Sequence, residues 1–175
     1  MNVFVHIISD SMMFPYDLSS YDESYSGLKF IESEDGTQIA TKLWKSNNEK
    51  NLILYFHGNY LDIGYLDNFA EMLNALGYSV LAMDYRGYGL SEGKASEKST
   101  YQDSQLLYEK ALKSGYTKDN IIIVGRSIGT GVATELALNN ESKALILISP
   151  FVSVYRVITK IPLLPFDKFN NFKVK

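Results

Sequence analysis

Hydrophobic and polar residues follow two different periods along this chain. Residues 28–33 and 37–44 alternate apolar and polar side chains on either side of Asp35 and Gly36. This pattern predicts an antiparallel hairpin closed by a short turn. Four later segments are apolar runs of the kind that forms strands buried on both faces of a parallel sheet, namely residues 50–59, 78–89, 120–127 and 143–150.

Segments with helical periodicity separate these runs. In residues 65–77 the apolar side chains share one helical face, namely Leu66, Phe69, Ala70, Leu73 and Leu76. Residues 96–115 and 128–140 also have helical spacing. Strands that alternate with helices of this length predict an α/β fold, with a mostly parallel sheet and helices on both faces.

The composition of the chain excludes several classes of partner and of site. The chain has 46% hydrophobic and 21% charged residues, as in an ordinary soluble domain. A net charge of −3 argues against a nucleic-acid partner, which requires clustered Lys and Arg. The absence of cysteine excludes disulfides, thiolate metal sites and palmitoylation. His6 and Asp10 interrupt an N-terminus that has no leading basic residue, so we expect no signal peptide and no transmembrane segment. The expected location is the cytoplasm, and peripheral association with a membrane is the alternative.

The sequence GRSIG places Ser127 between Gly125 and Gly129, after an aliphatic run and before an Ala-containing helix. The G-x-S-x-G pattern in this context predicts a nucleophile elbow, in which the serine is raised above the sheet edge. The backbone N–H of Ile128 is then the first candidate donor of an oxyanion hole, and that of Asn59 the second. The alternative is a glycine-rich turn that holds a phosphate, although the P-loop lysine is missing.

Four segments together resemble the α/β-hydrolase superfamily: YFHGNYLDIGYLDNFAEML, DYRGYGLSEGKASEKSTYQD, GRSIGTGVATELA and ALILISPFVSVYRV. The resemblance extends from about residue 28 to residue 172 and is closest to the depalmitoylase-like and related bacterial serine-hydrolase branch. It implies an α/β-hydrolase fold with Ser127 as the nucleophile. It also implies that Gly58 and Asn59 form the oxyanion loop, and that Ile128 follows the nucleophile as the other donor.

The resemblance gives the remaining motif residues supporting roles. His57 matches the histidine that orders the oxyanion loop and is not the catalytic base. Asp84, Arg86 and Gly87 match a turn that is mainly architectural, and Asp84 as the acid of a triad is the alternative.

The chain departs from the superfamily after Ser127. There the family places an acid and then a histidine, whereas this sequence has Asp167 as its one Asp and no His. Asp167 falls in a segment that resembles a cap-like insertion, and the family gives His6 no role. We therefore expect residues 1–27 to form an N-terminal extension and residues 28–175 an incomplete α/β-hydrolase domain that lacks the C-terminal strands.

The expected activity is hydrolysis of carboxylic ester or thioester bonds in a small or acylated substrate, impaired by the missing base. Residues 157–166 are a candidate acyl site, or an amphipathic core segment. A peptidase on the same scaffold, a non-catalytic interaction module and one half of a split hydrolase are the alternatives. Residues 143–150 would form an exposed strand edge, open to a strand-completing partner or to self-association. No cofactor or metal site is implied.

Overall fold

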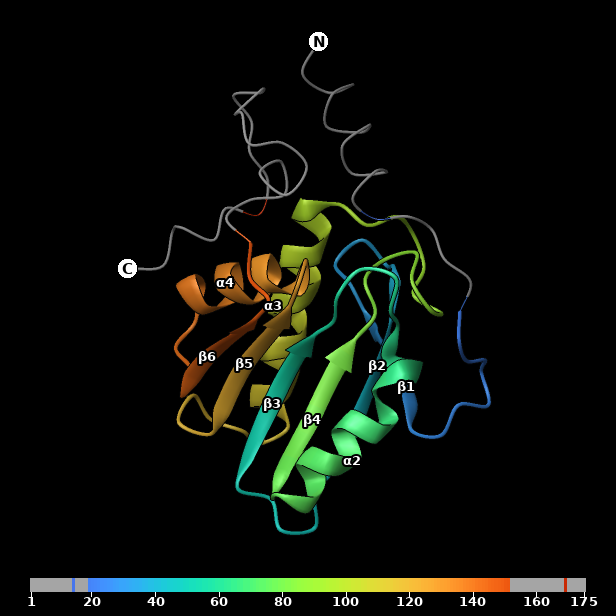
Figure 1. Cartoon of the computed structure of the whole chain (residues 1–175). Helices are drawn as coiled ribbons and strands as arrows, with labels where there is room; N and C mark the ends of the chain where they lie inside the picture. Colours follow the sequence, from blue (N-terminus) through green and yellow to red (C-terminus); the bar gives the residue numbers. More distant parts are fainter. Residues whose placement is uncertain (1–13, 15–18, 152–168, 170–175) are drawn as a thin grey trace.

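The fold is a six-stranded sheet with helices on both faces (Figure 1). The computed structural model describes Phe14, residues 19–151 and Phe169. The strands lie side by side in the order β1-β2-β4-β3-β5-β6. Their bounds are Leu28–Glu32 for β1, Gln38–Trp44 for β2, Asn51–Phe56 for β3, Tyr78–Met83 for β4, Ile121–Arg126 for β5 and Ala144–Ile148 for β6.

The antiparallel part of the sheet is the hairpin of β1 and β2. Leu28 lies opposite Lys42, and Glu32 lies opposite Gln38. The turn between the two strands contains Gly36 at a φ of 82°, a left-handed conformation that glycine adopts without steric cost. Strand β2 in turn pairs antiparallel with β4, which joins the hairpin to the rest of the sheet.

The remaining pairs, β4 with β3, β3 with β5 and β5 with β6, are all parallel. Parallel strands end at the same edge of a sheet, so the loops after β3, β4 and β5 are neighbours. The register places Phe56, the last residue of β3, beside Gly125 near the end of β5. This edge therefore gathers three of the motifs that the sequence analysis singled out.

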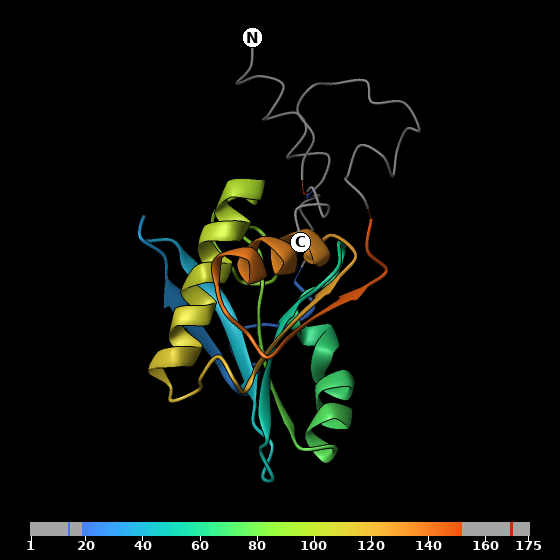
Figure 2. The same ribbon diagram turned by 90° about the vertical axis from the view of Figure 1, so that its left-hand side faces the viewer.

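Helices cover both faces of the sheet (Figures 1 and 2). On one face, the 3-10 helix η1 (Ile63–Leu66) leads into α2 (Asp67–Ala75). On the other lie α3 (Glu97–Lys113) and α4 (Gly129–Asn139). A capping box between Ser96 and Ser99 fixes the start of α3. The predicted class, a mostly parallel sheet with an antiparallel hairpin and helices on both faces, is confirmed.

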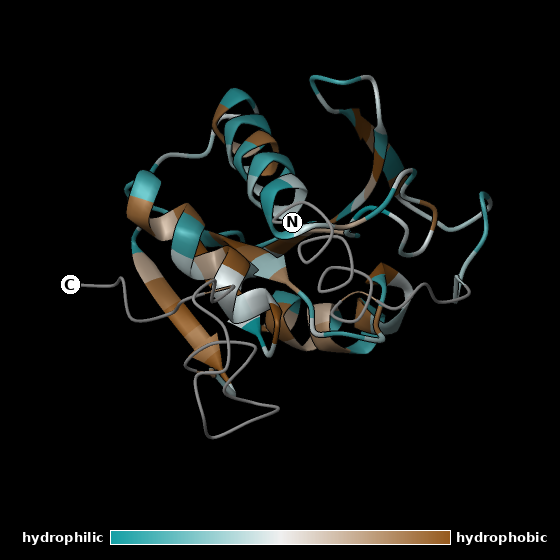
Figure 3. Cartoon of the chain, turned by 90° about the horizontal axis from the view of Figure 1, so that it is seen from above, coloured by the Kyte–Doolittle hydropathy of each residue, from teal (hydrophilic) through white to brown (hydrophobic). Residues whose placement is uncertain are grey.

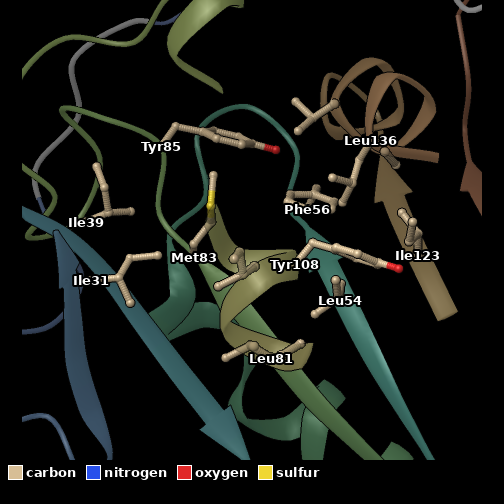
Figure 4. Packing of buried hydrophobic residues seen from close by; sticks show 14 of the residues in the cluster. Ile31, Ile39, Leu54, Phe56, Leu81, Met83, Tyr85, Tyr108, Ile123 and Leu136 are labelled. Carbon is tan, nitrogen blue, oxygen red and sulfur yellow. The ribbon is translucent and has the colours of Figure 1, made fainter. Parts of the chain in front are cut away.

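The sheet separates two apolar layers. Between the sheet and α3 with α4, alternate strand residues such as Leu54, Phe56 and Ile123 pack into a larger cluster (Figure 4). The intervening residues, Tyr55 and Val124 among them, face a smaller cluster under α2. Burial on both faces explains why these strands are continuous apolar runs in the sequence. No helix in the described part of the chain is long and apolar enough to cross a membrane.

Residues 19–27, assigned to the N-terminal extension, contact the sheet domain through polar groups. The Ser20 amide donates to Asp62 Oδ2 at 2.7 Å. The Tyr25 hydroxyl donates to Asp67 Oδ1 at 2.8 Å, and Lys42 and Trp44 donate to the same oxygen. This part of the extension is therefore packed against the domain.

Candidate active site

Ser127 lies at the turn between β5 and α4, and its side chain is exposed. Its φ is 51°, in the left-handed region that non-glycine residues seldom occupy. The surrounding backbone holds this conformation: the Ser127 amide donates to the Ile148 carbonyl at 2.9 Å. The Ser127 carbonyl accepts from the amide of Thr130 at 2.9 Å and from its hydroxyl at 2.6 Å. Strain held in place in this way is found at functional turns.

The two glycines of the motif are required by close packing. A Cβ on Gly125 would lie 2.6 Å from the Gly129 carbonyl carbon and 2.7 Å from the Ala133 side chain. A Cβ on Gly129 would lie 2.7 Å from the His57 carbonyl oxygen. Any larger residue at either position would separate β5, β3 and the start of α4. The contacts bring the first turn of α4 directly against the sheet edge.

The loop after β3 runs beside Ser127. A Cβ on Gly58 would lie 3.5 Å from Ser127 Cβ, which is ordinary van der Waals contact. Next to it, the Asn59 side-chain oxygen accepts from the Tyr88 hydroxyl and from the Tyr60 amide. On the other side of Ser127, the Ile128 amide makes no hydrogen bond to a backbone carbonyl of the described residues. An N–H at the first turn of a helix attracts negative charge.

His57 is buried and faces β4. Its imidazole lies against the Tyr85 ring, with 4.4 Å between centroids, and its Nδ1 is 2.8 Å from the Gly58 carbonyl oxygen. Its Nε2 lies 3.3 Å from Asp84 Oδ1 without meeting the geometry of a hydrogen bond. The Tyr85 hydroxyl donates to the His57 carbonyl at 2.9 Å. His57 thus fixes the loop that carries Gly58 and makes no hydrogen bond to Ser127.

Asp84 is surrounded by donors. Its Oδ1 accepts from the Ile63 amide at 2.8 Å, and its Oδ2 accepts from the Tyr21 hydroxyl. Burial raises the pKa of the Asp84 carboxyl, and the contacts with His57 and Tyr21 oppose that rise. The two carboxylate oxygens thus hold the start of η1 and the N-terminal segment in place. These contacts are those of a residue that supports the fold.

Arg86 fixes the turn that follows β4. Its guanidinium donates from Nε to Asp103 Oδ2 at 2.8 Å and from Nη2 to Oδ1 at 2.9 Å, a bidentate pair with a carboxylate on α3. The same Nη2 donates to Ser33 Oγ at 2.8 Å, and Nη1 donates to Asp35. This network joins the β1–β2 hairpin to α3 and supports the architectural role that the resemblance implies.

No base stands beside Ser127 in the described part of the chain. The Ser127 hydroxyl makes no hydrogen bond with any described residue, and His57 is the one histidine among them. The other sequence candidates, namely His6, Asp167 and the acyl segment at residues 157–166, lie outside the described residues. The structure therefore brings Gly58 beside Ser127, with Asn59 next to it in the chain, and it places His57 in a separate network.

A cavity of about 650 Å³ lies elsewhere, between the β1–β2 hairpin, α3 and α4. Its lining includes Arg86, Glu109 and Glu135 and none of the residues around Ser127. Within the described ranges, no group of three or more His, Cys, Asp or Glu side chains is placed to hold a metal ion.

Three tyrosines near the site, Tyr21, Tyr85 and Tyr88, have roles that the motifs do not predict. Tyr85 and Tyr88 are almost fully buried and hold the loop after β3 through their hydroxyl groups. The signal was present in DYRGYG, where two aromatic residues flank a glycine turn at a strand end. Tyr21 reaches Asp84 from 63 residues away, a contact that no local pattern encodes.

Comparisons with known proteins agree with this geometry. The sequence model of the family described as "Serine aminopeptidase, S33" matches residues 47–172. Human alpha/beta hydrolase domain-containing protein 17B is 40% identical over 126 residues, which cover 70% of this chain and 43% of the human protein. The relative aho-3 of Caenorhabditis elegans is 42% identical over 113 residues, covering 63% of this chain and 34% of that protein. The chain thus spans less than half the length of these relatives.

Solved structures share the fold. An alpha-beta hydrolase from Vibrio vulnificus superposes with a TM-score of 0.71 at 20% identity, over 97% of this chain and 70% of that one. An esterase from Exiguobacterium antarcticum has a TM-score of 0.56 at 28% identity, over 68% of this chain and 44% of the esterase. Fold and strand-end geometry thus define an α/β hydrolase. The chain belongs to the serine aminopeptidase S33 family of that superfamily, and the resemblance to the superfamily is confirmed.

Proposed function

We propose that this chain carries the nucleophile of a serine hydrolase that acts on carboxylic esters or thioesters. Ser127 Oγ would attack the acyl carbonyl carbon while its proton passes to a base. The C–O or C–S bond then breaks, and the leaving group takes the proton. Water would hydrolyse the acyl-serine in a second step. The amides of Ile128 and Asn59 would hold the oxyanion.

The observation that carries this proposal is the exposed, left-handed Ser127 between two glycines whose Cβ positions are blocked by backbone. A turn that served only to connect β5 with α4 would not require a strained serine at its apex. The ester class is supported by the likeness to the esterase from Exiguobacterium antarcticum, which is 28% identical to this chain.

The reaction is expected to be slow, because the described residues supply no imidazole to Ser127. A serine without a general base keeps its ordinary high pKa and is a poor nucleophile at neutral pH. Oxyanion donors and binding would still give a residual rate above that in water.

The test is covalent labelling with a fluorophosphonate probe, read by intact mass, with and without free imidazole in the buffer. We expect slow labelling at Ser127 that imidazole accelerates and that Ser127→Ala abolishes. Ser149→Ala is the matched control, since Ser149 follows the adjacent strand at a φ of 52° and should leave labelling unchanged. Labelling that survives Ser127→Ala, or no labelling with imidazole present, would contradict the proposal.

A non-catalytic interaction module is the second candidate. The missing hydrogen bond to the Ser127 hydroxyl among the described residues favours it. A folded protein that stays unlabelled under every condition would support this function. A peptidase on the same scaffold is suggested by the family's description as a serine aminopeptidase. The rates of hydrolysis of an aminoacyl amide and of the corresponding ester would distinguish a peptidase from an esterase.

A further inference from the structure

The loop that follows β3 has a strained backbone close to Ser127. Tyr60 has a φ of 59°, a left-handed conformation that bulky residues seldom adopt. Two residues earlier in the chain, a Cβ on Gly58 would lie 3.5 Å from Ser127 Cβ. Figure 3 looks down on this edge of the sheet, where the loops after β3, β4 and β5 are neighbours. A strained conformation persists only when the surrounding contacts impose it, so this loop requires anchors.

Hydrogen bonds to oxygen atoms of the loop supply such anchors. The Tyr85 hydroxyl donates to the His57 carbonyl at 2.9 Å. The His57 side chain in turn binds the Gly58 carbonyl oxygen, at 2.8 Å from Nδ1. The Tyr88 hydroxyl donates to Asn59 Oδ1. None of these contacts takes up a backbone N–H, the kind of group that binds an oxyanion.

The contact between Tyr88 and Asn59 acts on the strained part of the loop. Asn59 Oδ1 also accepts from the Tyr60 amide at 3.2 Å. One side-chain oxygen therefore holds the strained residue and is itself held by the Tyr88 hydroxyl. This arrangement ties the orientation of the Asn59 backbone to the turn that follows β4.

Tyr88 is a rigid donor. Its side chain is almost fully buried, and its ring makes T-shaped contacts with the rings of Tyr85 and Phe14, at 5.9 and 6.3 Å between centroids. Its amide donates to the Tyr85 carbonyl at 2.9 Å. Gly87, at a φ of 78°, allows the tight turn between the two tyrosines. Because ring and backbone are both fixed, the hydroxyl reaches Asn59 in a defined position.

We propose that Tyr88 is a positioning residue for the oxyanion hole. Its hydroxyl holds the Asn59 side chain so that the Asn59 backbone N–H points at the oxyanion formed when Ser127 attacks. This inference rests on the proposed function and adds to it a residue that acts on the reaction through Asn59. A donor stabilises an oxyanion only at hydrogen-bond distance from the developing charge, so a lost orientation lowers the rate although the donor is still present.

The test compares two probes in a buffer that contains imidazole. With both, Ser127 Oγ bonds to phosphorus, fluoride leaves and the hydroxyl proton passes to imidazole. The first probe is a fluorophosphonate, whose phosphoryl oxygen develops the charge that the oxyanion hole binds. The second carries sulfur in place of that oxygen, and sulfur is a weak hydrogen-bond acceptor. The ratio of the two labelling rates therefore reports the oxyanion hole, whereas a general loss of stability lowers both rates alike.

Tyr88→Phe removes one hydroxyl and keeps the ring. We expect labelling by the fluorophosphonate to slow by about tenfold, and labelling by the sulfur probe to change far less. Tyr108→Phe is the matched control, since Tyr108 is also buried and its hydroxyl donates to the Glu141 carbonyl at 2.6 Å, beyond the far end of α4 from Ser127. This variant should keep both rates. Thermal unfolding verifies that each variant is folded.

Asn59→Ala tests the route by which Tyr88 acts. It removes the side-chain acceptor and keeps the backbone N–H at the same position. We expect it to lower the ratio of the two rates as Tyr88→Phe does. Because both changes break the same contact, the double variant should label no more slowly than either single variant.

Each way of failing has a different result. A native chain that stays unlabelled with imidazole present would overturn the proposed function, and this inference with it. A native chain that is labelled, with an unchanged ratio in Tyr88→Phe, would overturn this inference alone. Equal slowing with both probes would mean that Tyr88 supports only the fold. Additive losses in the double variant would exclude Asn59 as the route.

Discussion

The carboxyl ends of β5 and of β3 with β4 lie at the same edge of the sheet, yet they have opposite character. At the end of β5, Ser127 is exposed and strained, and its hydroxyl makes no hydrogen bond with the described residues. At the ends of β3 and β4, His57 and Asp84 are fully buried among donors, acceptors and tyrosine rings.

This difference separates groups that can react from groups that hold the scaffold. Buried polar groups stabilise a fold when their partners are present and cost free energy when a partner is removed. The exposed side chain of Ser127 makes no hydrogen bond with the described residues, so its hydroxyl is available to a substrate. Substitutions at the two sites should therefore change the free energy of unfolding in opposite directions.

The largest loss in the free energy of unfolding is expected from Asp84→Ala. It removes the acceptor for the Ile63 amide and the Tyr21 hydroxyl and leaves His57 Nε2 without its carboxylate. Each buried donor left without its acceptor costs about 1–3 kcal/mol, so the combined loss is about 3–5 kcal/mol. Urea unfolding at neutral pH measures this loss in the free energy of unfolding. The control is Asp119→Ala at an exposed position, which should stay within about 0.5 kcal/mol of the native chain. A loss below about 1 kcal/mol would show that the network does not hold the scaffold.

Gly125→Ala should cost about 3 kcal/mol, at the upper end of overpacking effects. Its new methyl group would lie 2.6 Å from backbone of Gly129, which cannot move without separating α4 from the sheet. The matched variant is Gly58→Ala, whose Cβ meets Ser127 Cβ at a comfortable 3.5 Å. Thermal unfolding should show Gly125→Ala clearly destabilised and Gly58→Ala close to native. Similar losses at both positions would mean that close packing is not what requires glycine at 125.

How far the sequence predicts this edge depends on the range of each interaction. The strand, turn and helix around Ser127 lie within one continuous stretch of sequence, so periodicity and two glycines were sufficient to place them. The tyrosine network was not predictable, because Tyr21 contacts Asp84 across 63 residues and nothing in the local pattern of either segment requires the other. Arg86 lies between these cases: its turn was expected, but its partner Asp103 sits on α3 without a distinguishing pattern.

A gain in stability is expected from Ser127→Gly. Glycine adopts a φ of 51° without the strain of a side chain, which relieves about 1–2 kcal/mol. Part of that is lost because glycine makes the unfolded chain more flexible, so the net gain is about 0.5–1 kcal/mol. Chemical denaturation measures the gain. Ser127→Ala keeps a Cβ and should be nearly neutral. A destabilised Ser127→Gly would indicate that the serine side chain supports the fold, which would weaken the contrast between the two strand ends.

The smallest effect on the free energy of unfolding is expected from a substitution of Asp35, which lies at the rim of the Arg86 network. The hydrogen bond from the Arg86 guanidinium, with those from Thr37, holds the pKa of the Asp35 carboxyl well below its ordinary value. A lowered pKa in the folded state stabilises the protein above the unfolded-state pKa, and this contribution disappears as the pH falls below it. Asp35→Asn should therefore reduce stability slightly at neutral pH and make its decline below about pH 4 shallower. Asp35 is exposed to solvent, so screening keeps the effect small. The midpoints of urea unfolding at neutral and at acidic pH measure the stability of each variant and its decline with falling pH. Asp119→Asn is the control. An unchanged acid slope in Asp35→Asn would mean that the Arg86 network is held by Asp103 alone.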